Sequence, residues 1–266
     1  MENPLKLAVF TDLDGTLLDH DTYRWDAAKP ALNRLMEHGC AVVFATSKTF
    51  SEVHHLQKQM GLTHQPAIVE NGSGVIGGTG SEAAETYPEL RKILDHLPKP
   101  LRQKFKGFGD MSDEEIATLT RLTPESAERA KARGYSEPGL WTGSTDELSA
   151  FRTFLAKHGV TAQRGGRFLT LSFGRTKADA MATLASALNT DLTLALGDAP
   201  NDIEMLEKAD FGIIVHNPSH EPLPPLRGES EGRIIRTTET GPVGWNAAVT
   251  GVLNRVFPKK GPIAHG

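Results

Sequence analysis

Cysteine is nearly absent from this chain: Cys40 is the only one among 266 residues, so no disulfide can form within it. No run of about 18 apolar residues is present, which argues against a membrane-spanning helix. The residues before the first apolar strand contain no hydrophobic core of a secretory signal. We therefore expect a soluble cytoplasmic protein in which Cys40 is a small buried residue rather than a reactive thiol.

An excess of basic residues is also absent. Lys and Arg total 29 against 33 Asp and Glu, and the formal net charge of -4 gives no basic footprint for nucleic acid. The 38% apolar and 23% charged residues are ordinary for a protein with a packed core. We expect one large domain or two smaller ones that bind neither nucleic acid nor a membrane.

The first informative pattern is an apolar strand over residues 5–10 that leads into Asp12-Leu13-Asp14-Gly15. Residues at i and i+2 of an extended chain face the same way, so both carboxylates point into the crevice where open α/β sheets bind ligands. Two carboxylates this close repel each other unless a cation or a proton lies with them. Mg²⁺ fits, because it accepts few protein carboxylates and keeps phosphate oxygens and waters. A plain Asp-Gly turn is the alternative.

Strand and helix patterns then alternate. We expect a helix over 26–38, a strand over 41–45, a helix capped by Ser51 and ended by Gly61, and a strand over 66–69. The hydroxyl cluster Thr46-Ser47-Lys48-Thr49 between strand and helix suits a phosphate, although loop and cap residues alone could look the same. Asn71, in Glu70-Asn71-Gly72 after the last of these strands, is a candidate substrate contact or part of a plain turn.

The pattern changes from about Ser81 to residue 173. Helices are expected over 89–97, after capping boxes at Ser112 and Ser144, and from Thr123 to Gly134. Extended stretches over 161–163 and 167–173 are split by Gly165-Gly166, a hairpin signal. We interpret this region as an inserted α+β domain.

Three features of the insert are candidate binding elements. Tyr135-Ser136-Glu137-Pro138 is made rigid by its proline, and Arg164-Gly165-Gly166-Arg167 combines amides with two guanidinium groups that suit a carboxylate. For Arg129 and Arg133 we expect only a solvated helix face.

The last third contains two more candidate groups. Lys177 opens a helix capped by Thr176, where a cation opposes the helix dipole unless a phosphate is bound nearby. An apolar strand over 192–196 runs into Gly197-Asp198-Ala199-Pro200-Asn201-Asp202. A core strand over 211–215, an edge strand over 233–236 and a helix over 242–257 complete the chain.

Together these motifs resemble those of the haloacid dehalogenase superfamily, most of whose members are Mg²⁺-dependent phosphatases. The resemblance implies that Asp12 is the nucleophile, forming an aspartyl-phosphate, and that Asp14 is the general acid and base. It implies that Thr46 or Ser47 and Lys177 hold the phosphoryl group, and that Lys48 reaches the substrate. Mg²⁺ would be held by Asp12, Asp198 and the backbone carbonyl of Asp14. Asp202 would orient a water or Lys177, and Asn201 would contact metal-bound water or the substrate.

Ser136-Glu137-Pro138, Gly165-Gly166-Arg167-Phe168 and Gly241-Pro242-Val243-Gly244-Trp245 resemble segments of the mannosyl-3-phosphoglycerate phosphatases. This resemblance implies a Rossmann-like core with a mainly parallel sheet, formed by 1–80 and 174–266, and a substrate-specificity cap over 81–173. It implies hydrolysis of mannosyl-3-phosphoglycerate in mannosylglycerate biosynthesis. The implied substrate contacts are Ser47, Lys48, Asn71, Ser136, Glu137, Arg164, Gly165, Gly166 and Arg167.

Several alternatives remain open at this point. Arg164 stands where many of these relatives carry glutamine, which bears on the sugar or glycerate contact. Glucosyl-3-phosphoglycerate differs from the mannosyl ester only in its hexose, and other sugar phosphatases share the same core. A phosphomutase, or a binding protein on a hydrolase scaffold that has lost its activity, would also fit the fold.

Overall fold

The computed structural model describes residues 5–77 and 83–258. The chain divides into two compact units, Met1–Ala45 with Met181–Gly266, and Thr46–Ala180. The expected start of the cap near Ser81 and the tail after residue 258 lie outside the described residues. The division into a catalytic core (1–80 and 174–266) and a specificity cap (81–173) stays a prediction.

The strands of the first unit run parallel to one another in the order β11-β10-β9-β1-β2. Every residue of the central strand β1 is buried, as its apolar sequence requires, while most of β11 is exposed at the edge of the sheet. The expected strands are therefore all present. Their bounds are β1 (Leu7–Thr11), β2 (Ala41–Ala45), β9 (Leu192–Gly197), β10 (Phe211–His216) and β11 (Ile234–Thr240).

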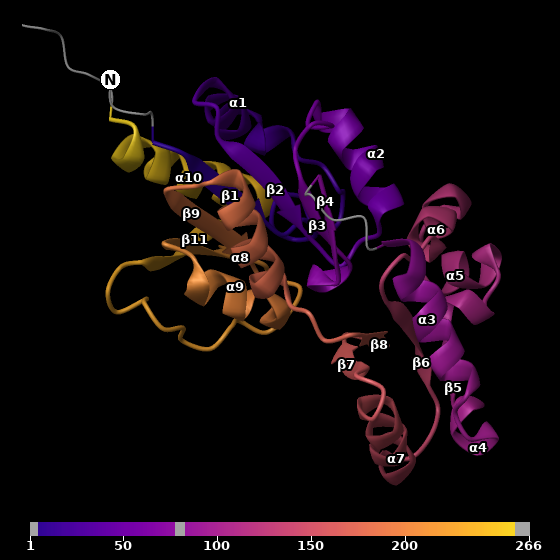
Figure 1. Ribbon diagram of the computed structural model, residues 1–266. Helices are drawn as coiled ribbons and strands as arrows, with labels where there is room; N and C mark the ends of the chain where they lie inside the picture. The colour runs from indigo at the N-terminus through magenta and orange to yellow at the C-terminus, as the bar shows by residue number, and fades with distance from the viewer. Residues whose placement is uncertain (1–4, 78–82, 259–266) are drawn as a thin grey trace, which may run out of the picture. The chain divides into compact units, whose positions relative to one another are not determined.

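Helices cover both faces of these strands (Figure 1). The connections β1-α1-β2 and β9-α9-β10 run in opposite directions across the sheet, so right-handed crossovers place α1 and α9 on opposite faces. Helix α10 packs against α1. The unit is thus a Rossmann-like α/β layer structure, as expected. The helices are α1 (Lys29–Glu37), after a 3-10 turn at Asp26–Ala28, α9 (Ile203–Lys208) and α10 (Gly241–Val256), while α8 (Lys177–Leu188) crosses the boundary between the units.

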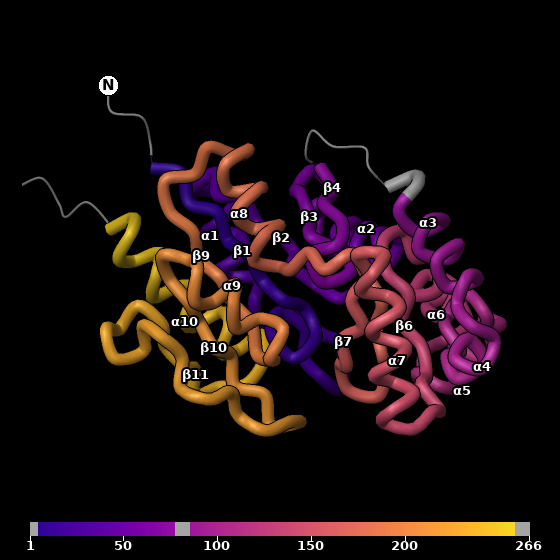
Figure 2. The backbone as a smooth tube through the Cα atoms, turned by 60° about the horizontal axis from the view of Figure 1, so that its bottom comes forward, coloured from indigo at the N-terminus to yellow at the C-terminus, as the bar shows by residue number. Residues whose placement is uncertain are grey.

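The second unit contains an antiparallel sheet of order β5-β6-β8-β7 and the antiparallel pair β3–β4. The β3–β4 pair can be followed in the tube of Figure 2. The strands are β3 (Ala67–Val69), β4 (Gly74–Ile76), β5 (Phe105–Gly107), β6 (Glu137–Trp141), β7 (Thr161–Gly165) and β8 (Phe168–Ser172). The helices are α2 (Phe50–Met60), α3 (Ala83–Asp95), α4 (Lys99–Arg102), α5 (Asp113–Thr120), α6 (Pro124–Lys131) and α7 (Thr145–Ala156).

Apolar side chains cover both faces of the four-stranded sheet. Leu169 and Leu171 of β8 pack in a buried cluster with residues of α3 and α7, whereas Phe168 packs with Ile116 of α5 and Ala127 of α6. Alternation along one strand thus supplies two small cores. This is the α+β architecture that the sequence predicted for the insert.

Three strands were missed and one local expectation was wrong. Strands β4, β5 and β6 were not predicted, and β6 runs through Glu137-Pro138, which we expected only to be rigid at its proline. Pro138 lies near the start of β6, where β5 offers it no partner, a place where a strand tolerates proline. Helix α2 is capped by Thr49 rather than Ser51, because Thr49 and Glu52 form a reciprocal capping box.

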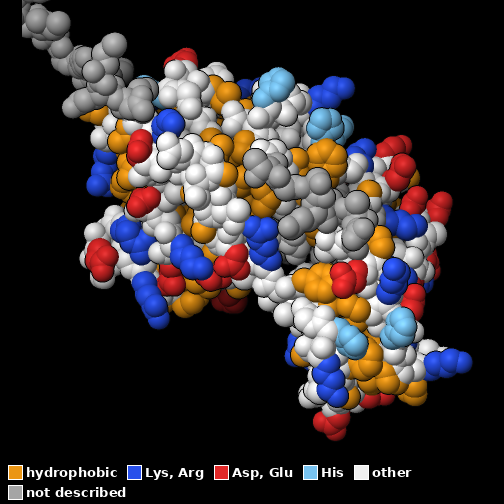
Figure 3. Space-filling model, viewed as in Figure 1, with side chains coloured by type: hydrophobic (Ala, Val, Ile, Leu, Met, Phe, Trp, Pro, Cys, Tyr) orange, Lys and Arg blue, Asp and Glu red, His pale blue; other side chains and the backbone are white. Residues whose placement is uncertain are grey.

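The charge distribution on the surface and the length of the helices are relevant to the binding of nucleic acid and membranes. Acidic and basic side chains are interspersed over the face shown in Figure 3. Within residues 5–77 and 83–258, no helix is both long and apolar enough to cross a bilayer.

Candidate active site

Three carboxylates of the first unit form what we call the carboxylate cluster: Asp12, Asp198 and Asp202. Each offers one oxygen, and these oxygens all lie within 4.8 Å of one another. Asp12 follows β1 and Asp198 follows the neighbouring strand β9, and the Asp12 amide donates to the Leu196 carbonyl at 2.9 Å. The three side chains are at most 8% exposed. Adjacent parallel strands therefore bring together acids that are far apart in the sequence.

The turn after Asp12 is built to pass close to Asp198. The amides of Thr16 and Leu18 donate to the Leu13 carbonyl, and Gly15 adopts a φ of +79°. A Cβ on Gly15 would lie 2.2 Å from Asn217 Nδ2 and 3.0 Å from Asp198 Oδ2. Only glycine fits here, both for its backbone conformation and for lack of space.

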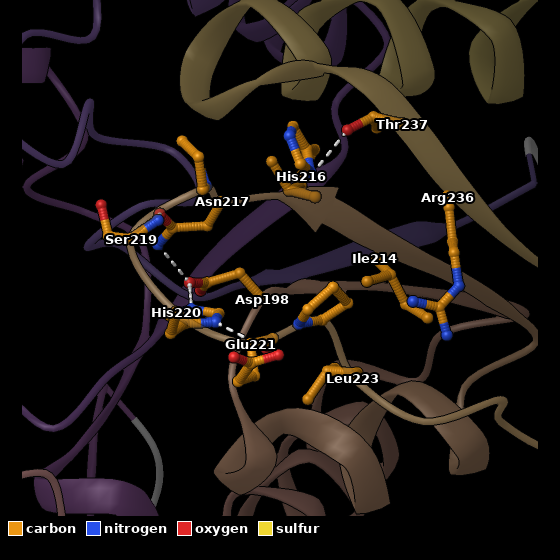
Figure 4. A pocket seen from close by; sticks show the side chains of 13 residues that line it. Asp198, Ile214, His216, Asn217, Ser219, His220, Glu221, Leu223, Arg236 and Thr237 are labelled. Carbon is orange, nitrogen blue, oxygen red and sulfur yellow. Dashed lines mark hydrogen bonds and ion pairs between the residues drawn. The ribbon is translucent and has the colours of Figure 1, made fainter.

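The Asp198 carboxylate accepts three hydrogen bonds from side chains. Thr16 Oγ1 donates to Oδ1 at 2.8 Å, while Asn217 Nδ2 and His220 Nε2 each lie 2.8 Å from Oδ2. Figure 4 shows His220 and Asn217 converging on Asp198 from the loop after β10, which lines an open cavity of about 720 Å³. Burial disfavours the imidazolium, but the hydrogen bond to Asp198 and its charge outweigh this and raise the pKa of His220.

The Asp202 side chain holds the backbone at Asp198 and Ala199 through hydrogen bonds. Its Oδ2 accepts from the amides of Asp198 at 3.1 Å and Ala199 at 3.0 Å. A Cβ on Gly197 would lie 2.4 Å from the Asp202 Cβ, so glycine makes this close approach possible. Asn201, by contrast, is exposed on the 3-10 turn Pro200–Asp202.

The Gly-Pro-Val-Gly-Trp segment near the C-terminus is connected to the nucleophile candidate by hydrogen bonds. Trp245 is fully buried, and its Nε1 donates to Thr11 Oγ1 at 3.0 Å. Thr11 Oγ1 in turn donates to the Asp12 carbonyl at 2.7 Å. Helix α10 is thereby tied to the backbone of Asp12.

The second unit contains the predicted phosphate-binding residues. Thr46 is buried, its hydroxyl accepts from the Lys48 amide at 3.2 Å, and its carbonyl accepts from the Asn71 amide at 2.9 Å. Ser47 is exposed and Lys48 half-buried. Lys177 is 1% exposed at the first residue of α8.

Close packing brings the 70–72 turn against the start of α8. A Cβ on Gly72 would lie 2.1 Å from the Thr176 carbonyl carbon and 2.5 Å from the Lys177 amide nitrogen. Thr176 caps α8, accepting from the Asp179 amide at 3.2 Å as expected. The second unit thus places the 46–48 loop beside the 70–72 turn, and that turn beside the backbone of Lys177.

Arg133 and Ser136 differ from what we expected. Arg133 was expected on a solvated helix face, but it lies beyond α6, its side chain is 7% exposed, and its Nε lies 3.3 Å from Glu70 Oε2. The expectation overlooked Glu70, the buried carboxylate that Arg133 meets. Arg133 also donates to Ser136 Oγ at 2.7 Å and, more weakly, to the Ser47 carbonyl at 3.4 Å. Ser136, Ser47 and Asn71 are therefore brought into one neighbourhood.

Glu137 belongs to a different neighbourhood of the second unit. Its carboxylate is fully buried and accepts from Tyr87 Oη at 2.7 Å, Arg91 Nη1 at 2.5 Å and the Gly109 amide at 2.9 Å. Burial raises the pKa of Glu137, partly offset by these hydrogen bonds. Arg91 also pairs with Asp110. Glu137 is thus held by this ionic cluster of the β-sheet domain.

The Gly-Gly hairpin forms the third group of predicted contacts. Arg164, Gly165, Gly166 and Arg167 are all exposed at the turn between β7 and β8, where Gly166 has a φ of +54°. Arg167 Nη1 donates to the Leu119 carbonyl at 2.5 Å. The hairpin expected from the sequence is present.

Sequence reasoning overlooked several residues of these sites. Neither His220 nor Glu70 was assigned a role. The signal for Glu70 was its place directly before Asn71, a candidate contact. No pattern marks His220, which reaches Asp198 only through the path of the loop.

Comparisons of the sequence and the fold with those of known proteins identify the family of this chain. A family model described as haloacid dehalogenase-like hydrolase matches residues 9–103 and 149–223, more than half of the chain. Sucrose-phosphatase from Synechocystis sp. has a similar structure, with a TM-score of 0.60 at 18% identity over 93% of this chain and 98% of that one. A hypothetical protein from Geobacillus kaustophilus gives a TM-score of 0.64 at 20% identity, over 92% and 98%. The chain belongs to the haloacid dehalogenase-like hydrolases.

A relative with higher sequence identity indicates the family within this superfamily. The glucosyl-3-phosphoglycerate/mannosyl-3-phosphoglycerate phosphatase of Persephonella marina is 34% identical over 94% of this chain and 98% of its own length. Within the superfamily, the chain therefore belongs to the mannosyl-3-phosphoglycerate phosphatase family, and it is a phosphoric monoester hydrolase.

Proposed function

We propose that this enzyme hydrolyses mannosyl-3-phosphoglycerate to mannosylglycerate and phosphate. The main observation in favour is the carboxylate cluster, which supports a metal-assisted phosphatase site in the first unit. The relative from Persephonella marina supports the substrate, since its name includes this ester. The same name includes glucosyl-3-phosphoglycerate, which is therefore the second candidate. A location in the cytoplasm remains a prediction.

The carboxylate cluster fits a hard divalent cation. All its donors are oxygens, they are buried, and they lie within 4.8 Å of one another, an arrangement of like charges that a cation stabilises. We infer that the side chains of Asp12 and Asp198 and the backbone carbonyl of Asp14 would hold Mg²⁺. When bound, it would neutralise charge that develops on the phosphoryl oxygens.

The chain's own residues would carry out the bond changes. A carboxylate oxygen of Asp12 attacks phosphorus, forming an aspartyl-phosphate as the ester oxygen departs. Asp14 gives its proton to that departing oxygen. It then takes a proton from the water that hydrolyses the aspartyl-phosphate, which regenerates both acids.

The remaining predicted residues would bind and orient the substrate. Thr46 or Ser47 and Lys177 would stabilise the phosphoryl oxygens, and Asn201 and Asp202 would order the surroundings of the metal. The cap would close over the substrate and exclude water. The proposed contacts to the sugar-glycerate part are Lys48, Asn71, Ser136, Glu137, Arg164, Gly165, Gly166 and Arg167.

The test is Mg²⁺-dependent phosphate release from mannosyl-3-phosphoglycerate, its glucosyl analogue and simple hexose phosphates. We expect the glycerate esters to exceed hexose phosphates in kcat/KM by about a hundredfold, or about 2.7 kcal/mol in the transition state. EDTA should abolish release. Equal, weak activity on all esters would overturn the substrate assignment, and a requirement for a sugar bisphosphate would indicate a phosphomutase.

A further inference from the structure

Glu70 is a buried carboxylate that the proposed mechanism does not use. It is 2% exposed, and its oxygens accept four hydrogen bonds from residues 134–136. The Gly134 amide donates to Oε1 at 2.8 Å, while the Tyr135 amide at 3.1 Å, the Ser136 amide at 2.7 Å and the Ser136 hydroxyl at 2.7 Å donate to Oε2. Three consecutive amides around one carboxylate form a complete anion receptor, occupied by the chain itself.

A cation completes the contact. Arg133 Nε lies 3.3 Å from Glu70 Oε2, and the Arg133 side chain is 7% exposed. The same guanidinium donates to Ser136 Oγ at 2.7 Å and approaches the Ser47 carbonyl at 3.4 Å. The hydrogen bond from this guanidinium to Ser136 is charge-assisted and therefore stronger than a neutral one, whereas Nε and Glu70 form an ion pair without a hydrogen bond. The segment 133–136 is therefore fastened both to Glu70 and to the loop that contains Ser47.

The backbone of Glu70 is held in an unusual conformation. Glu70, Asn71 and Gly72 have φ values of +50°, +60° and +98°. Such angles are costly for residues other than glycine and persist only where the surroundings enforce them. Here the Glu70 amide donates to the Lys48 carbonyl at 3.0 Å and the Asn71 amide to the Thr46 carbonyl at 2.9 Å.

The strained turn thus has two attachments. Its backbone is bonded to the 46–48 loop, proposed to bind phosphate, and the Glu70 side chain is bonded to Ser136, proposed to contact the rest of the substrate. Gly72 packs directly on the backbone at Lys177. A single residue therefore fixes the spacing between the phosphate-binding part and a substrate-contacting part of the second unit.

We propose that Glu70 is a positioning residue that determines specificity, holding Ser136 at a fixed place relative to the 46–48 loop. This inference rests on the proposed function. Glu70 itself contacts no substrate in this account. It selects esters that carry a sugar-glycerate group, because only these use both parts, whereas a minimal phosphate ester uses the phosphate-binding part alone.

The experiment compares kcat/KM for mannosyl-3-phosphoglycerate with kcat/KM for p-nitrophenyl phosphate in the full-length enzyme. In Glu70→Ala the ratio of the two should fall by about a hundredfold, the loss that a displacement of about 1 Å can cause. In Glu70→Gln the fall should be smaller, because the amide oxygen can still accept from some of the donors. Arg133→Gln leaves Glu70 in place and should lower the ratio in the same direction.

A matched control separates positioning from stability. Phe151→Leu weakens the buried core of the same unit, far along the sequence from the 46–48 loop, and should lower the melting temperature with no change in the ratio. The proposal would be overturned if Glu70→Ala, Glu70→Gln and Arg133→Gln each lowered kcat/KM for both substrates by the same factor. It would also be overturned if the ratio of the two kcat/KM values stayed unchanged in well-folded variants. If the wild-type enzyme shows no preference for the glycerate ester, the proposed function itself fails before any variant is compared.

Discussion

The two units both bury carboxylates, but they surround them differently. In the first unit Asp12, Asp198 and Asp202 gather like charge within 4.8 Å. In the second unit Glu70 and Glu137 each meet a guanidinium group and backbone amides. In the second arrangement guanidinium groups of the chain itself lie against the carboxylates, whereas in the first three acids lie together and His220 pairs with Asp198, and there we propose that a bound cation would offset the remaining like charge. A buried carboxylate is therefore informative about chemistry only together with the charges of its neighbours.

The largest expected effect follows from the gathered acids. In Asp12→Asn an amide replaces the proposed nucleophile, and kcat should fall by a factor on the order of 10⁶, as when other catalytic nucleophiles are removed. Phosphate release at saturating substrate and Mg²⁺ measures this. Asp26→Asn, an exposed aspartate in an ion pair with Lys29, is the control and should retain full activity. Near-normal turnover in the Asp12 variant would contradict the assignment.

For the buried carboxylates of the second unit, we expect loss of the guanidinium partner to lower the free energy of unfolding. Arg91→Met leaves the fully buried Glu137 without its guanidinium partner, and unfolding should become easier by about 3 kcal/mol. Urea unfolding measures the change. Lys106→Met removes an exposed pair with Glu115 and should cost less than about 1 kcal/mol. Equal effects of the two variants would remove the distinction between buried and exposed pairs.

A smaller effect is expected where a neutral hydrogen bond supports the first unit. Trp245→Phe keeps the ring in the core but removes the donor to Thr11, and should cost about 1 kcal/mol of stability. Thr11→Val removes the other side of the same bond. A double-mutant cycle measures the coupling between the two. Strict additivity of the single changes would show that the bond does not stabilise the fold.

The smallest effect concerns a partly exposed pair. Hydrogen bonds from Arg236, together with the Leu226 amide, lower the pKa of Glu229 to about 2 from 4.5. A depressed folded-state pKa means that the pair stabilises the fold fully above the unfolded pKa and loses that contribution as pH falls toward 2. Melting temperatures of Glu229→Gln and wild type should therefore differ above pH 4.5 and converge at acidic pH. A constant difference over that range would exclude ionisation of Glu229 as its cause.

The carboxylate cluster was predictable because local patterns determine it. Asp12 and Asp198 each follow a continuous apolar strand directly, and parallel strands in such folds present their carboxyl ends at one edge. The Thr176 cap and the capping boxes at Ser112 and Ser144 were predictable for the same reason, since each depends on residues three apart.

The residues that were missed depend on the fold rather than on local spacing. His220 reaches Asp198 from a proline-rich loop with no periodicity, and Arg133 meets Glu70 from far along the sequence. Strands β5 and β6 are short, and β6 contains Pro138 and Gly139, which lower the strand signal. At these positions tertiary packing, rather than local propensity, determines the structure.

The most direct test of the central comparison is the binding of Mg²⁺ to the substrate-free enzyme by calorimetry. Loss of a ligand's hydrogen-bonding partner alone typically costs about 10- to 100-fold in metal affinity, so Asp198→Asn should cost at least that much. Asp110→Asn, in the ionic cluster of the second unit, should leave the affinity unchanged. Equal Mg²⁺ affinity in the wild-type enzyme and in Asp198→Asn would contradict the account.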